Sequence, residues 1–338
     1  MVSSLRLLLT PTAVLSSLTA LAFVQSPARA LAQPAPVESF GVRPGPILRA
    51  AAELGTAEGE RLMQEAEQAI SAGDYPDAAS KLQAARESLN GASLRYQDLA
   101  DAFAGIDPDI TSDLRDRALT AAQSRDQATY QQALVYRAQG NPTLAVPLLI
   151  EIVQSQGPTR DLGQRAYQQL FELGFVNRAY RSPLTDPEAG SDSAALRSLG
   201  QPDSPIGIGV SARLIESAEQ ATANQNLAQA ADDLQAAREQ LNQVSGYYQT
   251  LVAVFGGIDT RVADDARQLA LEAAQLRDVA TYQQALVHRR QDRPELAVPL
   301  LVQILQSQNP TRDLGQQAYQ QLFEIGFVEL PYPTTAVE

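Results

Sequence analysis

The segment ATYQQALVYRAQGNPTLAVPLLIEIVQSQGPTRDLGQRAYQQLFELGFV, residues 128–176, decides the fold of this 338-residue chain. Residues 280–328, ATYQQALVHRRQDRPELAVPLLVQILQSQNPTRDLGQQAYQQLFEIGFV, repeat it with few changes. A shift of 152 residues aligns 61–176 with 213–328 without a gap. About 71 of the roughly 116 aligned positions are identical, which indicates a duplicated unit. The sequence therefore predicts two tandem homologous units, at residues 57–176 and 206–330.

The periodicity inside each unit is helical. Apolar residues recur at the spacing of an amphipathic helix in the segment that contains Leu144, Leu148 and Ile152. No alternating stretch is long enough to predict a strand, so we expect an all-α fold of about seven helices per unit. Residues 109–139 fit either one long helix or two, and the helix boundaries within 90–125 and 242–277 stay open. Pro147 and Pro299 fall inside expected helices and should kink them.

Six positions of the first unit carry a family resemblance. Ala133, Tyr136, Gly140, Ala145, Leu149 and Pro158 follow the spacing of a tetratricopeptide helix–turn–helix, and the second unit has Ala285, His288, Ala297, Leu301 and Pro310. The chain thus resembles a divergent tetratricopeptide-like α-solenoid, present as two tandem units. It departs from the family pattern because it lacks Trp and carries Asp292 where a turn glycine is usual.

The N-terminal 32 residues have the pattern of a secretory signal peptide. Arg6 precedes an apolar stretch, and the segment ends in the small-residue triplets Ala28-Arg29-Ala30 and Ala30-Leu31-Ala32. An uncleaved membrane anchor is the alternative, but a proline and several hydroxyl residues interrupt the apolar run. Cleavage before Gln33 predicts an exported protein without stable membrane insertion, located in the periplasm, outside the cell or in another compartment reached by general secretion.

The remaining segments connect or follow the units. Residues 33–56 are predicted to form an N-terminal linker. Residues 177–205 are rich in Pro, Ser, Gly and acidic residues, which predicts an extended or flexible linker, and residues 331–338 form a C-terminal tail.

The composition excludes several kinds of chemistry. The chain has no Cys, one His and a formal net charge of −13. Cysteine nucleophiles, disulfides, iron–sulfur clusters and metal sites with two or more His are therefore ruled out, and we expect neither a metal nor a cofactor. The acidic balance argues against nucleic acid as a partner, because nucleic-acid binding requires clustered Lys and Arg. His288 aligns with Tyr136, a packing position, so we interpret it as an interhelical contact.

The candidate site comes from polar residues that the two units share. About 43 of the last 56 aligned positions are identical against about 28 of the first 60, an uneven pattern that includes many amides. Amides donate and accept hydrogen bonds without charge, which suits peptide backbone or sugar hydroxyls. We therefore expect a surface patch, presented twice, made of Gln131, Gln132, Thr159, Arg160, Gln164, Gln168, Gln169, Gln283, Gln284, Thr311, Arg312, Gln316, Gln320 and Gln321. Recent gene conversion, or helix-favouring Gln on a solvated face, explains the same pattern.

These observations favour a non-enzymatic binding or scaffold protein with a protein or peptide partner, or a cell-wall polymer. A glycan hydrolase that uses a carboxylate pair is the enzymatic alternative, because such a mechanism needs neither His nor Cys. No pair of the shared acids stands out in the sequence. A purely structural helical protein is the third interpretation.

Overall fold

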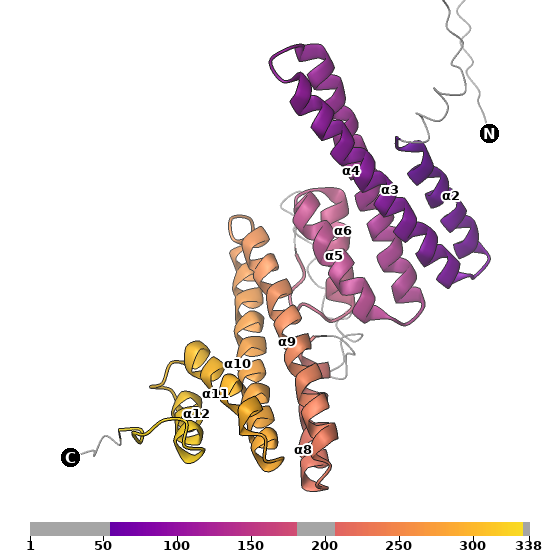
Figure 1. Ribbon diagram of the computed structural model, residues 1–338. Helices are drawn as coiled ribbons and strands as arrows, with labels where there is room; N and C mark the ends of the chain where they lie inside the picture. The colour runs from indigo at the N-terminus through magenta and orange to yellow at the C-terminus, as the bar shows by residue number, and fades with distance from the viewer. Residues whose placement is uncertain (1–54, 181–206, 334–338) are drawn as a thin grey trace, which may run out of the picture. The chain divides into compact units, whose positions relative to one another are not determined.

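The computed structural model describes residues 55–180 and 207–333. This part of the chain contains ten α-helices and no strand, which confirms the predicted all-α fold (Figure 1). The predicted signal peptide, residues 1–32, lies outside the described residues. So do most of the predicted linkers at 33–56 and 177–205 and most of the tail at 331–338.

Five helices fall in the first predicted unit. They are α2 (Ala57–Ser71), α3 (Tyr75–Phe103), α4 (Pro108–Ala138), α5 (Pro142–Gln156) and α6 (Asp161–Glu172). Each helix packs against the next one along the chain, and the long helices α3 and α4 lie side by side (Figure 1).

The second half has the same succession of helices. They are α8 (Ile208–Ala223), α9 (Leu227–Phe255), α10 (Thr260–Arg290), α11 (Pro294–Gln308) and α12 (Asp313–Glu324). Helices α9 to α12 begin and end 152 residues after α3 to α6, so the offset found in the sequence also relates the helices. All ten helices belong to one compact unit.

The expectation of about seven helices per unit is wrong, because the described residues of each predicted unit contain five. Residues 108–138 form one helix, which settles the choice left open for 109–139, and residues 75–103 form another. Gly91 lies inside α3 but does not end it. The buried Leu89 and Ser93 flank it, and the Ser93 hydroxyl donates to the Ala118 carbonyl of α4 over 3.0 Å. Packing against α4 thus outweighs the low helix propensity of a single glycine.

Aspartate side chains cap the N-termini of the two longest helices among the described residues. The Asp107 carboxylate accepts hydrogen bonds from the backbone N–H groups of Asp109 and Ile110 at the start of α4. Asp259 caps α10 in the same way. Such caps satisfy N–H groups that lack a partner within the helix, and the aspartate charge complements the helix dipole.

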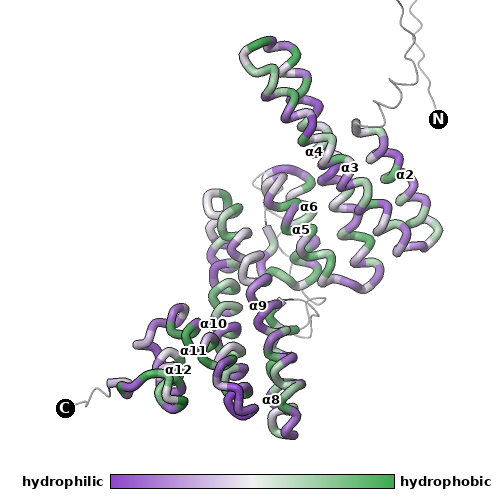
Figure 2. Tube along the Cα trace, viewed as in Figure 1, coloured by the Kyte–Doolittle hydropathy of each residue, from purple (hydrophilic) through white to green (hydrophobic). Residues whose placement is uncertain are grey.

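Small side chains bring the helices together. Ala66, Ala78, Ala85, Ala133 and Ala145 are fully buried, and the helices alternate between hydrophobic and hydrophilic residues along their length (Figure 2). This alternation is that of amphipathic helices with one buried face. Within the described residues, no helix combines the length and the apolar character needed to cross a membrane.

Candidate functional site

Two members of the predicted amide patch are buried rather than exposed. Gln132 and Gln284 are 1% and 4% exposed, so neither lies on a surface patch. The Gln132 side chain donates to the carbonyl oxygen of Ala79 on α3 and accepts a 2.8 Å hydrogen bond from the Arg86 guanidinium. Gln284 has the equivalent contacts with Ala231 and Arg238. Each amide therefore holds two helices together, which corrects the expectation that Gln132 and Gln284 belong to a surface patch.

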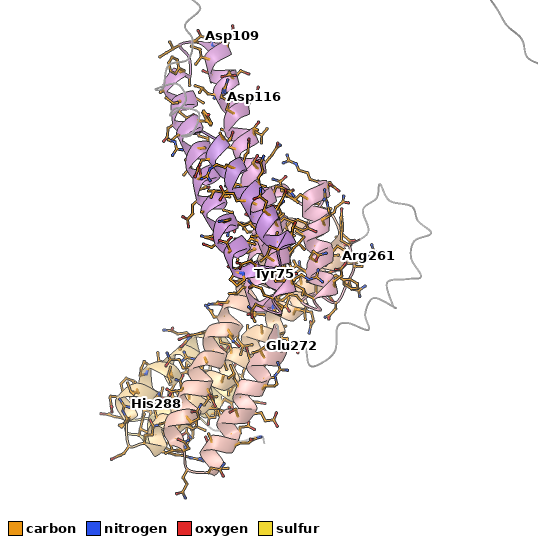
Figure 3. The ribbon with its side chains drawn as sticks, turned by 90° about the vertical axis from the view of Figure 1, so that its right-hand side faces the viewer. Tyr75, Asp109, Asp116, Arg261, Glu272 and His288 are labelled. Atoms are coloured by element: carbon orange, nitrogen blue, oxygen red, sulfur yellow. The ribbon has the colours of Figure 1, made fainter. Side chains whose placement is uncertain are left out.

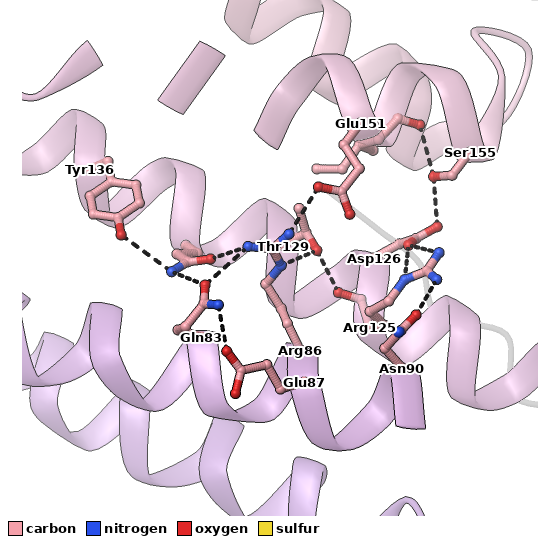
Figure 4. A network of polar contacts seen from close by, with 12 residues as sticks. Gln83, Arg86, Glu87, Asn90, Arg125, Asp126, Thr129, Tyr136, Glu151 and Ser155 are labelled. Atoms are coloured by element: carbon pink, nitrogen blue, oxygen red, sulfur yellow. Dashed lines mark hydrogen bonds and ion pairs between the residues drawn. The ribbon is translucent and has the colours of Figure 1, made fainter. Parts of the chain in front are cut away.

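A guanidinium forms the centre of this polar network (Figure 4). Arg86 extends from α3 and donates to the Thr129 hydroxyl over 2.9 Å, to Gln132 on α4 and to the Glu151 carboxylate of α5 over 2.9 Å. One side chain thus connects three helices. Hydrogen bonds of a charged donor are stronger than those between neutral groups, so Arg86 fixes the spacing of α3, α4 and α5.

The second half repeats the network with one change of charge. Arg238 donates to Thr281, Gln284 and Gln303, and Gln303 stands where the first half has Glu151. Burial lowers the pKa of the Arg238 guanidinium, and the nearby charge of Arg277 lowers it further. The first network therefore contains an ion pair that the second replaces with a neutral hydrogen bond.

A buried acid adjoins each network, and sequence reasoning missed its role. Asp126 is 2% exposed, pairs with Arg125 over 2.7 Å and accepts hydrogen bonds from Ser155 and Gln156 of α5. Asp278 has an equivalent pairing with its neighbour Arg277 in the second half. The Arg-Asp dipeptide that both copies retain was the available signal. Buried charges need such partners, so these acids serve packing.

Other predicted glutamines contact nearby acids. Gln168 and Gln169 both donate to Glu172, which also pairs with Arg137 of α4 over 3.2 Å. Gln320 and Gln321 contact Glu324 in the same way, and the hydrogen bond from Arg289 holds the pKa of the Glu324 carboxyl below its usual range.

The last predicted residues lie at other places in the fold. Gln131 and Gln283 donate to Glu67 of α2 and Glu219 of α8, whereas the Gln164 and Gln316 amides donate to the carbonyl oxygens of Thr159 and Thr311. Arg160 and Arg312 are exposed. The fourteen residues therefore do not form one surface in either half: some bridge helices, some are buried and some lie at the start of α6 or α12.

An open groove lies beside the first network, between the start of α3 and the end of α4. Its volume is about 640 Å³, and its lining combines two tyrosines with amide, hydroxyl and small apolar side chains. The lining residues are Tyr75, Pro76, Ala79, Ser80, Gln83, Tyr136, Gln139 and Asn141. Tyr75 lies at the opposite end of the α3–α4 pair from Asp109 and Asp116 (Figure 3).

The network positions the wall of this groove. The buried Gln132 amide lies 3.4 Å from the Tyr136 hydroxyl and 3.3 Å from the Gln83 carbonyl oxygen, so one side chain orients two lining residues (Figure 4). Of the predicted patch, Gln132 thus contributes to the groove from behind it. The lining itself contains no carboxylate, imidazole or amine.

The equivalent positions of the second half have different chemistry. Leu227 and His288 replace the two tyrosines, and Arg293 replaces Asn141. The Gln291 amide donates to the Leu227 carbonyl oxygen over 2.9 Å, and its own carbonyl oxygen lies 3.1 Å from the His288 ring. The half-buried His288 side chain therefore contacts Gln291 at the end of α10. Only the first half presents a tyrosine pair at these positions.

Among the described residues, no group of three or more His, Asp or Glu side chains is placed to hold a metal ion. Compared with models of protein families and with curated protein sequences, the chain matches none.

Proposed function

We propose that the chain is an exported, non-enzymatic binding or scaffold protein whose first half holds an extended peptide segment of a partner protein. On this proposal the two halves are divergent tetratricopeptide-like units of an α-solenoid. The packing of each helix against its neighbour along the chain supports that architecture. The matching helix bounds 152 residues apart support the duplication.

The observation that carries the proposal is the groove beside Tyr75 and Tyr136. Two tyrosine rings supply contact area at a small cost in side-chain entropy, and their hydroxyls supply polar contacts. Gln83, Gln139 and Asn141 add donors and acceptors that suit a peptide backbone.

The same lining favours binding over catalysis. General acid–base chemistry needs a titratable group within hydrogen-bond reach of the reacting atom, and a glycan hydrolase needs two carboxylates that flank the scissile bond. The groove offers amides, hydroxyls and tyrosines instead. A cell-wall polymer is the second candidate ligand, because tyrosine faces and amides also suit sugar rings and their hydroxyls.

Affinity capture from the exported fraction tests the proposal. The bait is the chain from Gln33 onward, compared with its Tyr75→Ala/Tyr136→Ala variant, and the matched control is Leu227→Ala/His288→Ala at the equivalent positions. We expect one set of proteins that the tyrosine variant loses and the control retains. A parallel assay with purified wall polymer separates the second candidate. Equal capture by all three baits would refute the role of the groove.

A further inference from the structure

The two halves of the chain contact each other through an aromatic interface. Phe175, just after α6, stacks on Tyr248 of α9 with ring centroids 4.8 Å apart, and the Tyr248 hydroxyl donates to the Phe175 carbonyl oxygen over 2.9 Å. Tyr167 and Tyr180 both pack on Phe255, with centroid distances of 4.8 and 5.2 Å. Helix α5 also packs against α9, and one continuous core joins the halves. We call Tyr167, Phe175 and Tyr180 of the first half the docking end. We call the surface on which they pack, formed by α9 and the start of α10, the receiving face.

The second half carries its own copy of the docking end. Tyr319, Phe327 and Tyr332 stand 152 residues after Tyr167, Phe175 and Tyr180. The Tyr319 and Tyr332 rings are 5.8 Å apart in an edge contact, and the first half has the same kind of contact at 6.2 Å. The Tyr319 hydroxyl donates to the Leu330 carbonyl oxygen over 3.0 Å, as the Tyr167 hydroxyl donates to the Arg178 carbonyl oxygen over 2.9 Å.

This second docking end is exposed. Phe327 is 57% exposed, whereas its counterpart Phe175 is 2% exposed. Leu330, which replaces Arg178, is 74% exposed. The segment after α12 has therefore kept the shape that docks in the first half and has become more apolar.

The first half carries an exposed copy of the receiving face. Tyr96, Leu99, Phe103 and Ile110 are the counterparts of Tyr248, Leu251, Phe255 and Val262. Leu99 is 47% exposed where Leu251 is fully buried, and Ile110 is 40% exposed where Val262 is 2% exposed. The helices that carry them have equal lengths, and Ser93 and Ser245 make the same hydrogen bond across each helix pair. The exposed face is thus already formed.

We infer that the occupant of each exposed surface is a second copy of this chain, bound head to tail. The docking end of one chain, at Phe327, fits the receiving face of the next, at Leu99, because the molecule already contains this interface once between equivalent surfaces. The interface is heterologous: each chain offers one surface of each kind. Repetition of such a contact produces an open series of chains or a ring, whereas a two-fold dimer would use the same surface twice.

Two single variants and their mixture test this inference. Leu99→Glu removes the receiving face and leaves the docking end intact; Phe327→Glu does the opposite. Leu99 is 47% and Phe327 57% exposed, and neither belongs to the buried core, so both substitutions should leave the fold intact. Leu271→Glu is the matched control, because this leucine and its counterpart Leu119 are exposed to a similar degree in both halves. Molar mass is measured by light scattering on the chain from Gln33 onward over roughly 1 µM to 1 mM, the range in which weak interfaces associate.

The wild-type chain and Leu271→Glu are expected to increase in mass with concentration by multiples of one chain. Each of the other two variants is expected to stay monomeric alone, and their equimolar mixture to reach twice the monomer mass. A wild-type chain that stays monomeric throughout, or single variants that still assemble, would overturn the inference. Assembly that appears only after deletion of residues 33–54 would overturn it as well, because that segment would then be the occupant of the receiving face.

Cross-linking supplies a second, independent measurement. The chain has no cysteine, so Asp113→Cys and Leu330→Cys each introduce a single thiol and leave the aromatic rings in place. These positions match Asp265 and Arg178, whose side chains pair over 3.8 Å across the interface between the halves, so a short bismaleimide should join the two variants when they are mixed. Leu271→Cys mixed with Leu330→Cys is the control. Equal yields of the two cross-linked products would count against the head-to-tail contact.

Discussion

Replacing the buried amide Gln132 with alanine should destabilise the protein far more than the same change at its neighbour Gln131. Gln132→Ala removes the acceptor of the 2.8 Å hydrogen bond from Arg86 and the donor of the 3.2 Å hydrogen bond to the Ala79 carbonyl oxygen. Gln131→Ala removes one 3.4 Å hydrogen bond to the exposed Glu67. The two glutamines are adjacent on α4, so any gain in helix propensity is the same for both.

The structure sets the expected magnitudes. A hydrogen bond to a charged group contributes about 1.5–3 kcal/mol and a neutral one about 0.5–1.5 kcal/mol. Arg86 keeps Thr129 and Glu151 as partners, and its side chain is 17% exposed, so it loses only part of its stabilisation. We therefore expect Gln132→Ala to lower the free energy of unfolding by about 2–3 kcal/mol and Gln131→Ala by about 0.5 kcal/mol or less.

Urea unfolding followed by circular dichroism measures both variants, with the midpoint shift converted at a common m-value. Gln284→Ala should repeat the large loss in the second half, because Gln284 holds Arg238 over 2.5 Å. If Gln132→Ala costs no more than Gln131→Ala, the amide does not stabilise the contact between α3 and α4.

Three further outcomes follow from local structure and one from the sequence. A Cβ at Gly163 would overlap the carbonyl oxygen of the turn before α6, so Gly163→Ala should cost about 1–3 kcal/mol in urea unfolding. Asp259→Ala should cost about 1 kcal/mol through loss of the α10 cap. The hydrogen bond from the neighbouring arginine lowers the Asp259 pKa, so this contribution is present above about pH 4 and is lost as the pH falls through the folded-state pKa. Burial raises the pKa of Tyr167 and Tyr248, so stability should fall as the pH rises above about 10, where unfolded tyrosine ionises, and tyrosinate absorbance should rise together with unfolding. The signal-peptide pattern of residues 1–32 predicts that the mature protein begins at Gln33, which mass spectrometry of its intact N-terminus would establish.

The fold class and helix starts were accessible from sequence because they depend on local chemistry. The apolar stripe around Leu148 predicts a helix, as found in α5, and Asp107 followed by Pro108 is a pattern typical of the capped start that α4 has. The number of helices was not accessible, since local signals leave the helix boundaries within 90–125 and 242–277 open. Contacts with α4 decide that, and they are made by residues far away in sequence.

The candidate site was only partly accessible. Gln132 lies four residues after Ala128 and four before Tyr136, on the face of α4 that packs against other helices, so its spacing could have indicated burial. Nothing local distinguishes a buried amide of this kind from a solvated one, because both suit a helix. The groove forms because Tyr75, at the start of α3, and Tyr136, near the end of α4, lie at the same end of two antiparallel helices. The sequence could predict this only if the lengths of both helices were known.

Photo-cross-linking from the groove tests the central claim, partner binding by the first half, most directly. A photoreactive amino acid replaces Ser80, which lines the groove, or Asp232, which is the equivalent residue of the second half. Each protein is expressed in its native cells and irradiated there. We predict a discrete adduct with a partner protein from position 80 that disappears in the Tyr75→Ala/Tyr136→Ala background, and no such adduct from position 232. Identical adducts from both positions, or none from position 80, would contradict the account.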